Sequence, residues 1–312
     1  MGLDKNGINR CVSACLAALV AVIGVLVILQ LSALVLGPPS SVCTKQVCLA
    51  KFLEGPPAFN NKAMANYLQS NYFSPPASAE YRLSGHDGMN PAVKELVAFI
   101  KTYFKDKRGG VFLDLGAGDG EYHSITLPLE RDLGWSGLLV EPNPNLYKKL
   151  LKKARKASAA RLCVSPYSYP AKLNMAYPKV KEDASEEEEL AEMGKTKLEA
   201  LWDKEILGKD QHEVVGVQCV PLENLIYAGG LTSTIDLMVL DMSGTDLDLL
   251  LNTKLDEVPE IEMLVVRANG ADISNDIAGY FLERNMVMKR VFGANPFVAI
   301  YVLTKFDARR DM

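Results

Sequence analysis

Several residue types that mark common functional classes are scarce in this sequence of 312 residues. It has three histidines and no Cys-x-x-Cys pair, so the spacings typical of zinc sites are absent and we expect no bound metal. The net charge of −4 gives no basic surface for nucleic acid, and we expect no nucleic-acid partner. The sequence contains no Asn-x-Ser/Thr sequon and no internal repeat.

One long segment lacks charge altogether, since no charged residue lies between Arg10 and Lys45. A helix needs about 20 apolar residues to cross a bilayer core of about 30 Å. A cleavable signal peptide has an apolar stretch of only about 7 to 15 residues. The sequence therefore predicts a transmembrane signal anchor over residues 11–36, bound to membrane lipid, after a short cytosolic tail over residues 1–10.

The charges and cysteines around the predicted anchor indicate which side of the membrane the domain faces. The basic residues before the anchor lie closer to it than those after it, which predicts a cytosolic tail and a lumenal domain. We expect a single-pass protein of endoplasmic reticulum, Golgi or endosomal membranes. Cys43 and Cys48 are spaced to close a small disulfide loop in such an oxidising lumen. Cys163 and Cys219 are predicted to be buried thiols in strands.

Beyond a proline-rich stem over residues 37–90, the sequence predicts one domain over residues 91–312, in which helices and strands alternate. Predicted helices cover 91–103, 125–133 and 145–157; predicted strands cover 110–115, 137–140, 161–164, 214–220, 235–240, 261–266, 286–292 and 297–304. Such alternation implies a parallel sheet with right-handed crossovers, and the short connection before the last strand implies an antiparallel hairpin. We predict an α/β fold with a doubly wound, mostly parallel sheet and a reversed last strand.

Two charged runs interrupt this pattern. An insertion over about 170–212 contains the acidic run Glu182–Glu189, predicted to be an exposed loop, followed by a solvated helix over 190–206. Its position between strands indicates a lid or a partner surface. The basic run Lys148–Lys156 is predicted to be the exposed face of a helix.

A glycine motif follows the first predicted strand and has the spacing Gly-x-Gly-x-Gly. Glycines tolerate positive φ and let the backbone approach a ligand. The motif suits a nucleoside with an amino-acid tail, as in S-adenosylmethionine, better than a pyrophosphate. An acid at the end of the next strand is placed to accept both ribose hydroxyls. The predicted cofactor-binding residues are Asp114, Gly116, Ala117, Gly118, Gly120 and Glu141. The alternative is a tight strand-to-helix turn beside a solvated Glu141.

Three residues near this motif are catalytic candidates for methyl transfer. Asp241 follows a central strand, while Glu121 and His123 lie just beyond the glycine loop. Methyl transfer is an in-line displacement, so positioning supplies much of the acceleration, and a base is needed only for a weak oxygen nucleophile. Each residue also has a simpler role: Asp241 as a helix cap, His123 as a surface residue, and Glu121 as a charge that complements a helix dipole.

The segment Asp114–Gly120, together with Trp135–Pro144 and Tyr147, resembles the FkbM-type methyltransferases, and specifically their membrane-anchored Star-like branch. The resemblance covers roughly residues 60–305 and the anchor. It implies a fold of the S-adenosylmethionine-dependent methyltransferase type, with S-adenosylmethionine as cofactor and O-methyl transfer as reaction. The Star-like branch implies an alternative, in which the protein escorts membrane-bound growth-factor precursors from endoplasmic reticulum to Golgi.

One motif departs from the family pattern. The family has a strand that reads Lys-x-Asp-x-Glu-Gly-x-Glu, and in the corresponding segment, which includes Leu240–Asp246, Asp241 and Gly244 match. An apolar residue replaces the lysine, and Ser243 replaces the first glutamate. These replacements remove groups that orient a hydroxyl or act as a base, so they bear on catalysis more than on fold.

Overall fold

A computed structural model of the chain describes residues 19–24, 60–85, 89, 91–201, 211–242, 253, 258–269, 285–295 and 298–305. The chain divides into two compact units, Met1–Lys51 and Phe52–Met312. The fold described below is that of the second unit.

In the first unit, residues 19–24 are the described part, and they are helical. Their large apolar side chains are exposed, with Leu19 and Val20 the most accessible. No helix among the described residues is long and apolar enough to cross a bilayer. The rest of the predicted anchor over 11–36, the tail, and the predicted disulfide-forming pair of cysteines lie outside the described residues.

Helices and strands are interspersed along the chain of the second unit. The helices are α3 Lys62–Tyr72, α4 Pro91–Tyr103, α5 Thr126–Leu133, α6 Pro144–Lys152, α7 Glu186–Met193, the short η1 Glu199–Leu201 and α8 Leu222–Ala228. The strands are β1 Phe73–Ser74, β2 Val111–Leu115, β3 Ser136–Val140, β4 Ser158–Ala160, β5 Cys163–Val164, β6 Ala171–Pro178, β7 Lys197–Leu198, β8 His212–Val220, β9 Ile235–Leu240, β10 Ile261–Asn269, β11 Met286–Asn295 and β12 Val298–Lys305.

The main sheet has eight strands in the order β1-β4-β3-β2-β9-β10-β12-β11. The five strands from β4 to β10 are parallel to one another, and the short β1 is antiparallel to β4 at one edge. β12 runs antiparallel to both β10 and β11, so it is a reversed strand inserted between them. The prediction of a doubly wound, mostly parallel sheet with a reversed last strand is therefore confirmed.

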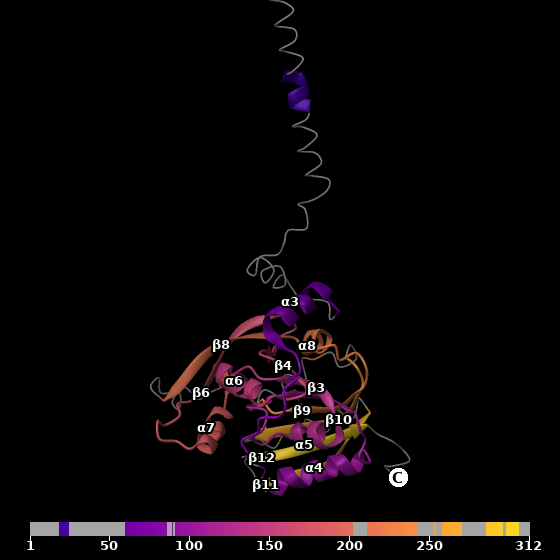
Figure 1. Cartoon of the computed structure of the whole chain (residues 1–312), viewed down its shortest axis with the longest axis vertical. Coiled ribbons are helices and arrows are strands. Elements are labelled where there is room, and N and C mark those ends of the chain that lie inside the picture. Colours follow the sequence, from indigo (N-terminus) through magenta and orange to yellow (C-terminus); the bar gives the residue numbers. More distant parts are fainter. Residues whose placement is uncertain are drawn as a thin grey trace, which may run out of the picture. The chain divides into compact units, whose positions relative to one another are not determined.

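Helices cover both faces of this sheet because its central strands are apolar on both sides. In β2, Phe112 packs in the cluster with α4 and α5, whereas Leu113 packs in the cluster with α3 and α8. β9 alternates in the same way, with Leu237 on one face and Met238 on the other. Figure 1 shows α4 on one side of the sheet and α8 on the opposite side. Strands buried on both faces are typical of parallel sheets.

Part of the predicted stem belongs to the domain. Asn61 caps α3 by accepting a hydrogen bond from the backbone N–H of Met64 at 3.0 Å. Met64 and Leu68 are buried in the core. β1 then pairs with β4, with Phe73 opposite Ala160. The domain therefore begins before residue 91, since both a helix and an edge strand precede it.

The third parallel strand lies earlier than predicted. It is β4, whereas the predicted strand 161–164 contributes only β5, in a different sheet. The preceding helix α6 ends at Lys152 and not near residue 157, since Ala154 has a φ of 55°. Lys153 and Arg155 are buried, and this turn directs them inward. The small residues of β4 carry no apolar alternation, so the sequence pattern did not mark it as a strand.

The acidic insertion folds into a second sheet with the order β5-β8-β6-β7 and the helix α7. Figure 1 shows the long β6 and β8 extending to one side, with α7 near them. The predicted acidic loop is wrong, because Ser185 forms a capping box with Glu188 and the acids fill the first turn of α7. The predicted helix over 190–206 is also wrong, since α7 ends at Met193.

A disulfide between Cys163 and Cys219 joins β5 to β8, so the prediction of two separate thiols is wrong. The two cysteines are direct partners in the parallel pairing, with their Cα atoms 4.3 Å apart. Their sequence separation of 56 residues encloses β6, α7 and β7. The disulfide therefore closes the base of the insertion.

This disulfide predicts a redox-dependent stability. Replacing both cysteines by alanine is expected to lower the free energy of unfolding by about 2–4 kcal/mol, because the unfolded chain loses a long covalent loop. Thermal unfolding with and without dithiothreitol measures the effect, and peptide mapping under non-reducing conditions detects the bond. The double variant serves as the control, since its unfolding should not respond to the reductant. Free thiols at both positions in the oxidised protein would contradict the assignment.

Candidate functional site

A cavity of about 490 Å³ opens at the carboxyl ends of the central strands. Leu115 of β2, Val140 of β3 and Val239 of β9 line it. From β2 the sheet continues through β3 to β4 in one direction and through β9 to β10 in the other. Ligands of open α/β sheets bind at such a switch point, and the volume lies within the usual range of about 300–1,000 Å³ for ligand pockets.

The glycine loop after β2 forms one wall of this cavity, and its glycines differ in their surroundings. Gly116, at φ 91°, lies directly against the backbone carbonyl of Asp241, where any Cβ would collide. Gly118, at φ 59°, has open space where a Cβ would stand, with no atom within 4 Å. Gly116 therefore lets the loop pack on the end of β9, whereas Gly118 leaves room for a ligand. Ala117 also lines the cavity, whereas Gly120 packs against Leu150.

Glu141 lies at the end of β3 and is only 4% exposed. Its Oε2 accepts the backbone N–H of Gly118, and its Oε1 accepts that of Asn143, both at 2.8 Å. Burial raises the pKa of Glu141 to about 8, against the lowering effect of these two hydrogen bonds. The alternative of a solvated strand-end acid is therefore excluded.

Asp114 supplies a second buried carboxylate in the cavity wall. Its Oδ2 accepts the Thr126 hydroxyl at 2.6 Å. Burial raises the pKa of Asp114 to about 6, and the charge of Asp241 raises it further, while Thr126 and Arg155 oppose the shift. Two carboxylates with raised pKa values in one cavity are a frequent mark of a functional site.

Asp241 lines the cavity as predicted, and it has a partner that the sequence analysis missed. Its Oδ2 lies 2.7 Å from Nη1 of Arg267, which projects from β10. Burial raises the pKa of Asp241, and Arg267 opposes the shift. The signal for Arg267 was present in the sequence, because it is a single cation at the end of the apolar strand Ile261–Val266.

Of the other two catalytic candidates, His123 lies in the cavity wall and Glu121 lies outside it. His123 lines the cavity, with its ring 4.2 Å from that of Tyr122 between centroids. Glu121 is 2% exposed and is not among the described residues that line the cavity. Its carboxylate instead binds Lys153 and the backbone of Ser84 and Gly85, so its position argues against a catalytic role.

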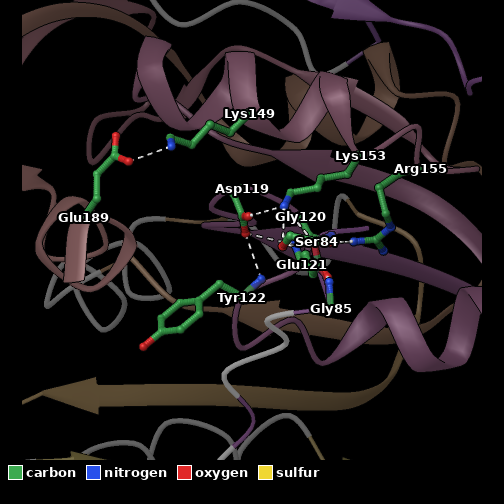
Figure 2. Close-up of polar contacts among 10 residues, drawn as sticks. All are labelled: Ser84, Gly85, Asp119, Gly120, Glu121, Tyr122, Lys149, Lys153, Arg155 and Glu189. Atoms are coloured by element: carbon green, nitrogen blue, oxygen red, sulfur yellow. Dashed lines mark hydrogen bonds and ion pairs between the residues drawn. The ribbon is translucent and has the colours of Figure 1, made fainter. Parts of the chain in front are cut away.

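Glu121 belongs to a buried cluster of charged residues behind the glycine loop. Lys153 Nζ lies 2.7 Å from Glu121 Oε2 and 3.3 Å from Asp119 Oδ2 (Figure 2). Asp119 Oδ1 accepts the backbone N–H of Glu121 and of Tyr122, which fixes the turn after the loop. Although burial opposes it, hydrogen bonding to Lys153 and Ser84 lowers the pKa of Glu121. The cluster therefore holds the loop against the segment that contains Ser84.

Arg155 supports the same loop from a second direction. Its guanidinium donates to the backbone carbonyl of Gly120 and to Thr126 Oγ1, and pairs with Glu130 at 3.1 Å. Thr126 in turn donates to Asp114, so Arg155 is connected to the cavity wall. The prediction that the basic run is an exposed helix face is wrong for Lys153 and Arg155, which are 6% and 3% exposed.

The insertion provides the opposite wall of the cavity. Leu190 and Met193 of α7, followed by Thr196, line it. Asn143, beside Glu141, donates to Thr196 Oγ1 at 3.0 Å. Lys149 of α6 pairs with Glu189 of α7 at 2.8 Å, as Figure 2 shows. The insertion therefore forms part of the cavity wall, and its role as a lid or a partner surface stays a prediction.

Comparison with known proteins relates this architecture to methyltransferases. The model of the methyltransferase FkbM domain matches residues 114–293, which is more than half of the chain. The chain therefore belongs to the FkbM methyltransferase family. No curated protein sequence matches this chain.

Solved methyltransferase structures show distant similarity. The human methyltransferase 10 domain containing protein is 9% identical, with a TM-score of 0.38 over 85% of this chain and 99% of its own. TrmK of M. capricolum, in complex with S-adenosyl-homocysteine, is 10% identical, with a TM-score of 0.36 over 70% and 69%. A putative RNA methyltransferase from Pyrococcus horikoshii is 14% identical, with a TM-score of 0.35 over 79% and 100%.

We predict that removing the positive charge of Lys153 strongly lowers the free energy of unfolding. Lys153→Met is expected to destabilise the protein by about 3–5 kcal/mol, because Glu121 and Asp119 stay buried without a counter-charge. Urea denaturation measures the change. The matched control is Lys152→Met, at an exposed neighbouring position, which should change stability by less than about 0.5 kcal/mol. Equal stability of the two variants would show that the cluster does not hold the loop.

Proposed function

We propose that this chain is a membrane-anchored, S-adenosylmethionine-dependent methyltransferase that transfers a methyl group to an oxygen acceptor in the secretory pathway. The observation that carries the proposal is the juxtaposition of the open side of Gly118 with the buried carboxylate of Glu141. Family membership supports methyl transfer as the type of reaction.

The residues of the cavity fit this cofactor. Each oxygen of Glu141 accepts one backbone N–H and retains capacity for a further donor, which the two ribose hydroxyls would supply. Leu162, Val164 and Pro142 give the cavity an apolar surface suited to an adenine ring. Asp114, in β2 directly before the glycine loop, also lines the cavity. The bound cofactor would supply an electrophilic methyl group on a sulfonium.

The chain's own residues contribute mainly by positioning. His123 and Asp241 both line the cavity, and His123 is placed to contact an acceptor. Burial raises the pKa of Asp241, and the ion pair with Arg267 opposes this shift and occupies one carboxylate oxygen. Walls from the glycine loop and from α7 exclude water and orient the reactants, which is the main requirement for an in-line displacement.

Two features support a lumenal location for the proposed reaction. The uncharged run over residues 11–36 has the length of a membrane anchor. The disulfide between Cys163 and Cys219 is typical of an oxidising compartment. We therefore propose that the domain faces the lumen of the endoplasmic reticulum, Golgi or endosomes. Protease protection of the domain in intact microsomes tests this, and digestion from the cytosolic side would contradict it.

The second candidate function is that of a Star-like escort for membrane-bound growth-factor precursors. The replaced lysine and glutamate of the Leu240–Asp246 motif favour it, because these replacements remove groups that orient a hydroxyl or act as a base. Under this proposal, co-precipitation with a precursor should survive Gly118→Arg in a folded variant. Loss of the association in that variant would count against an escort role.

Calorimetric titration of the full-length chain in detergent with S-adenosylmethionine tests the first proposal. We expect saturable binding that Gly118→Arg abolishes, because its side chain would fill the open space beside Glu141. The matched control is Gly109→Arg, which also has a positive φ and open surroundings but lies at the other end of β2. Absence of binding to the unmodified chain at millimolar cofactor would reject the enzyme proposal.

Cofactor binding is also expected to depend on pH. At pH 7 Glu141, with a pKa of about 8, is mostly protonated in the free protein. Ribose hydroxyls and a cationic ligand favour its ionised form, so binding should release a proton, and affinity should rise from pH 6.5 to 9. Calorimetry in buffers of different ionisation enthalpy counts the protons. In Glu141→Gln the release should fall, and unchanged release would assign the proton to another group.

A further inference from the structure

The ion pair between Asp241 and Arg267 remains accessible to the cavity. Both residues line it, and their side chains keep 26% and 17% of their surface exposed. A guanidinium has five N–H donors. In the part of the chain that the structure describes, one of these donates, to Asp241. The pair therefore retains capacity to bind a polar group of a ligand.

The pair lies next to the glycine loop. Val266 is the partner of Leu240 in the parallel pairing, so Arg267 and Asp241 follow at the same level of the sheet. Gly116 packs against the backbone carbonyl of Asp241. Glu141 ends β3, two strands away from β9, a spacing of roughly 10 Å. A ligand whose ribose binds Glu141 thus needs an extension across the loop to reach Arg267.

The charges around the pair define the chemistry of that extension. Asp114, Glu141 and Asp241 gather at this edge, and Asp241 raises the pKa of both other carboxyl groups. An isolated anion would be repelled by the charge of Asp241, whereas Arg267 would repel a simple cation. A zwitterion satisfies both signs, since its ammonium faces carboxylates and its carboxylate faces the guanidinium.

We propose that Arg267 binds the α-carboxylate and Asp241 the α-ammonium of an amino-acid group, so that this pair selects a nucleoside with an amino-acid tail. The inference rests on the proposed function and deepens it by naming the residues that recognise the tail. Arg267, from β10, also supplies a positive charge to the cavity, whereas the lysine of the family pattern is absent from the Leu240–Asp246 motif.

Two ligands that differ in the tail test this. S-adenosylhomocysteine and 5′-methylthioadenosine share the adenosine thioether, but only the first carries the amino acid. In calorimetry on the full-length chain in detergent, Arg267→Met should weaken binding of S-adenosylhomocysteine by about 10- to 100-fold, the range expected for a charged hydrogen bond. Binding of 5′-methylthioadenosine should change by less than about twofold. Arg267→Lys should recover part of the loss.

The second ligand also reports on folding, since a variant that binds it normally has an intact adenosine site. Arg131→Met, on the exposed side of α5, is the matched control and should bind both ligands as the unmodified chain does. An equal loss for both ligands, or no loss for S-adenosylhomocysteine, overturns the inference while the proposed function stands. If the unmodified chain binds neither ligand, the proposed function and the inference both fail.

Discussion

The conformation of the glycine loop depends on two cations buried behind it. Both residues lie just after the end of α6. Lys153 binds the carboxylates of Asp119 and Glu121, and Arg155 binds the carbonyl of Gly120. Burial of a cation is costly unless it is paired, and here every cation has a buried anionic partner. The left-handed glycines give the loop many alternative conformations, so these contacts are needed to select one.

The same network joins parts of the chain that are distant in sequence. Ser84, from the segment before α4, donates to Glu121, while Arg82 donates its backbone N–H to the carbonyl of Lys153. On the opposite wall, Lys149 of the same helix pairs with Glu189 of the insertion. Helix α6 therefore connects the loop, the N-terminal segment and the insertion, and a displacement of this helix would alter two walls of the cavity together.

Local patterns in the sequence were sufficient for the central fold. The apolar strands β2 and β9, the helix α4 and the Asp114–Gly120 motif are marked by residues close together in the chain, and their predicted positions agree with the structure. Glu141 was placed correctly because the carboxyl ends of neighbouring parallel strands meet at one edge.

The parts that sequence reasoning missed depend on long-range pairing. The disulfide follows from the register of β5 with β8, and the role of Lys153 from its contact with Glu121, 32 residues earlier. A solvated helix face and a buried counter-charge have the same local composition, so the basic run by itself favours the commoner solvated face. The pairing of Arg267 is not evident from local sequence for the related reason that its partner Asp241 follows another strand.

The position of β12 has a consequence for biosynthesis. Its residues, Val298–Lys305, lie between β10 and β11 and hydrogen-bond with both. Among the described strands, the one that completes this half of the main sheet is therefore the last to be synthesised. Until then β10 exposes an unpaired edge, which is a site for wrong strand pairing. The central sheet of the nascent domain thus stays open on one side until β12 has been synthesised.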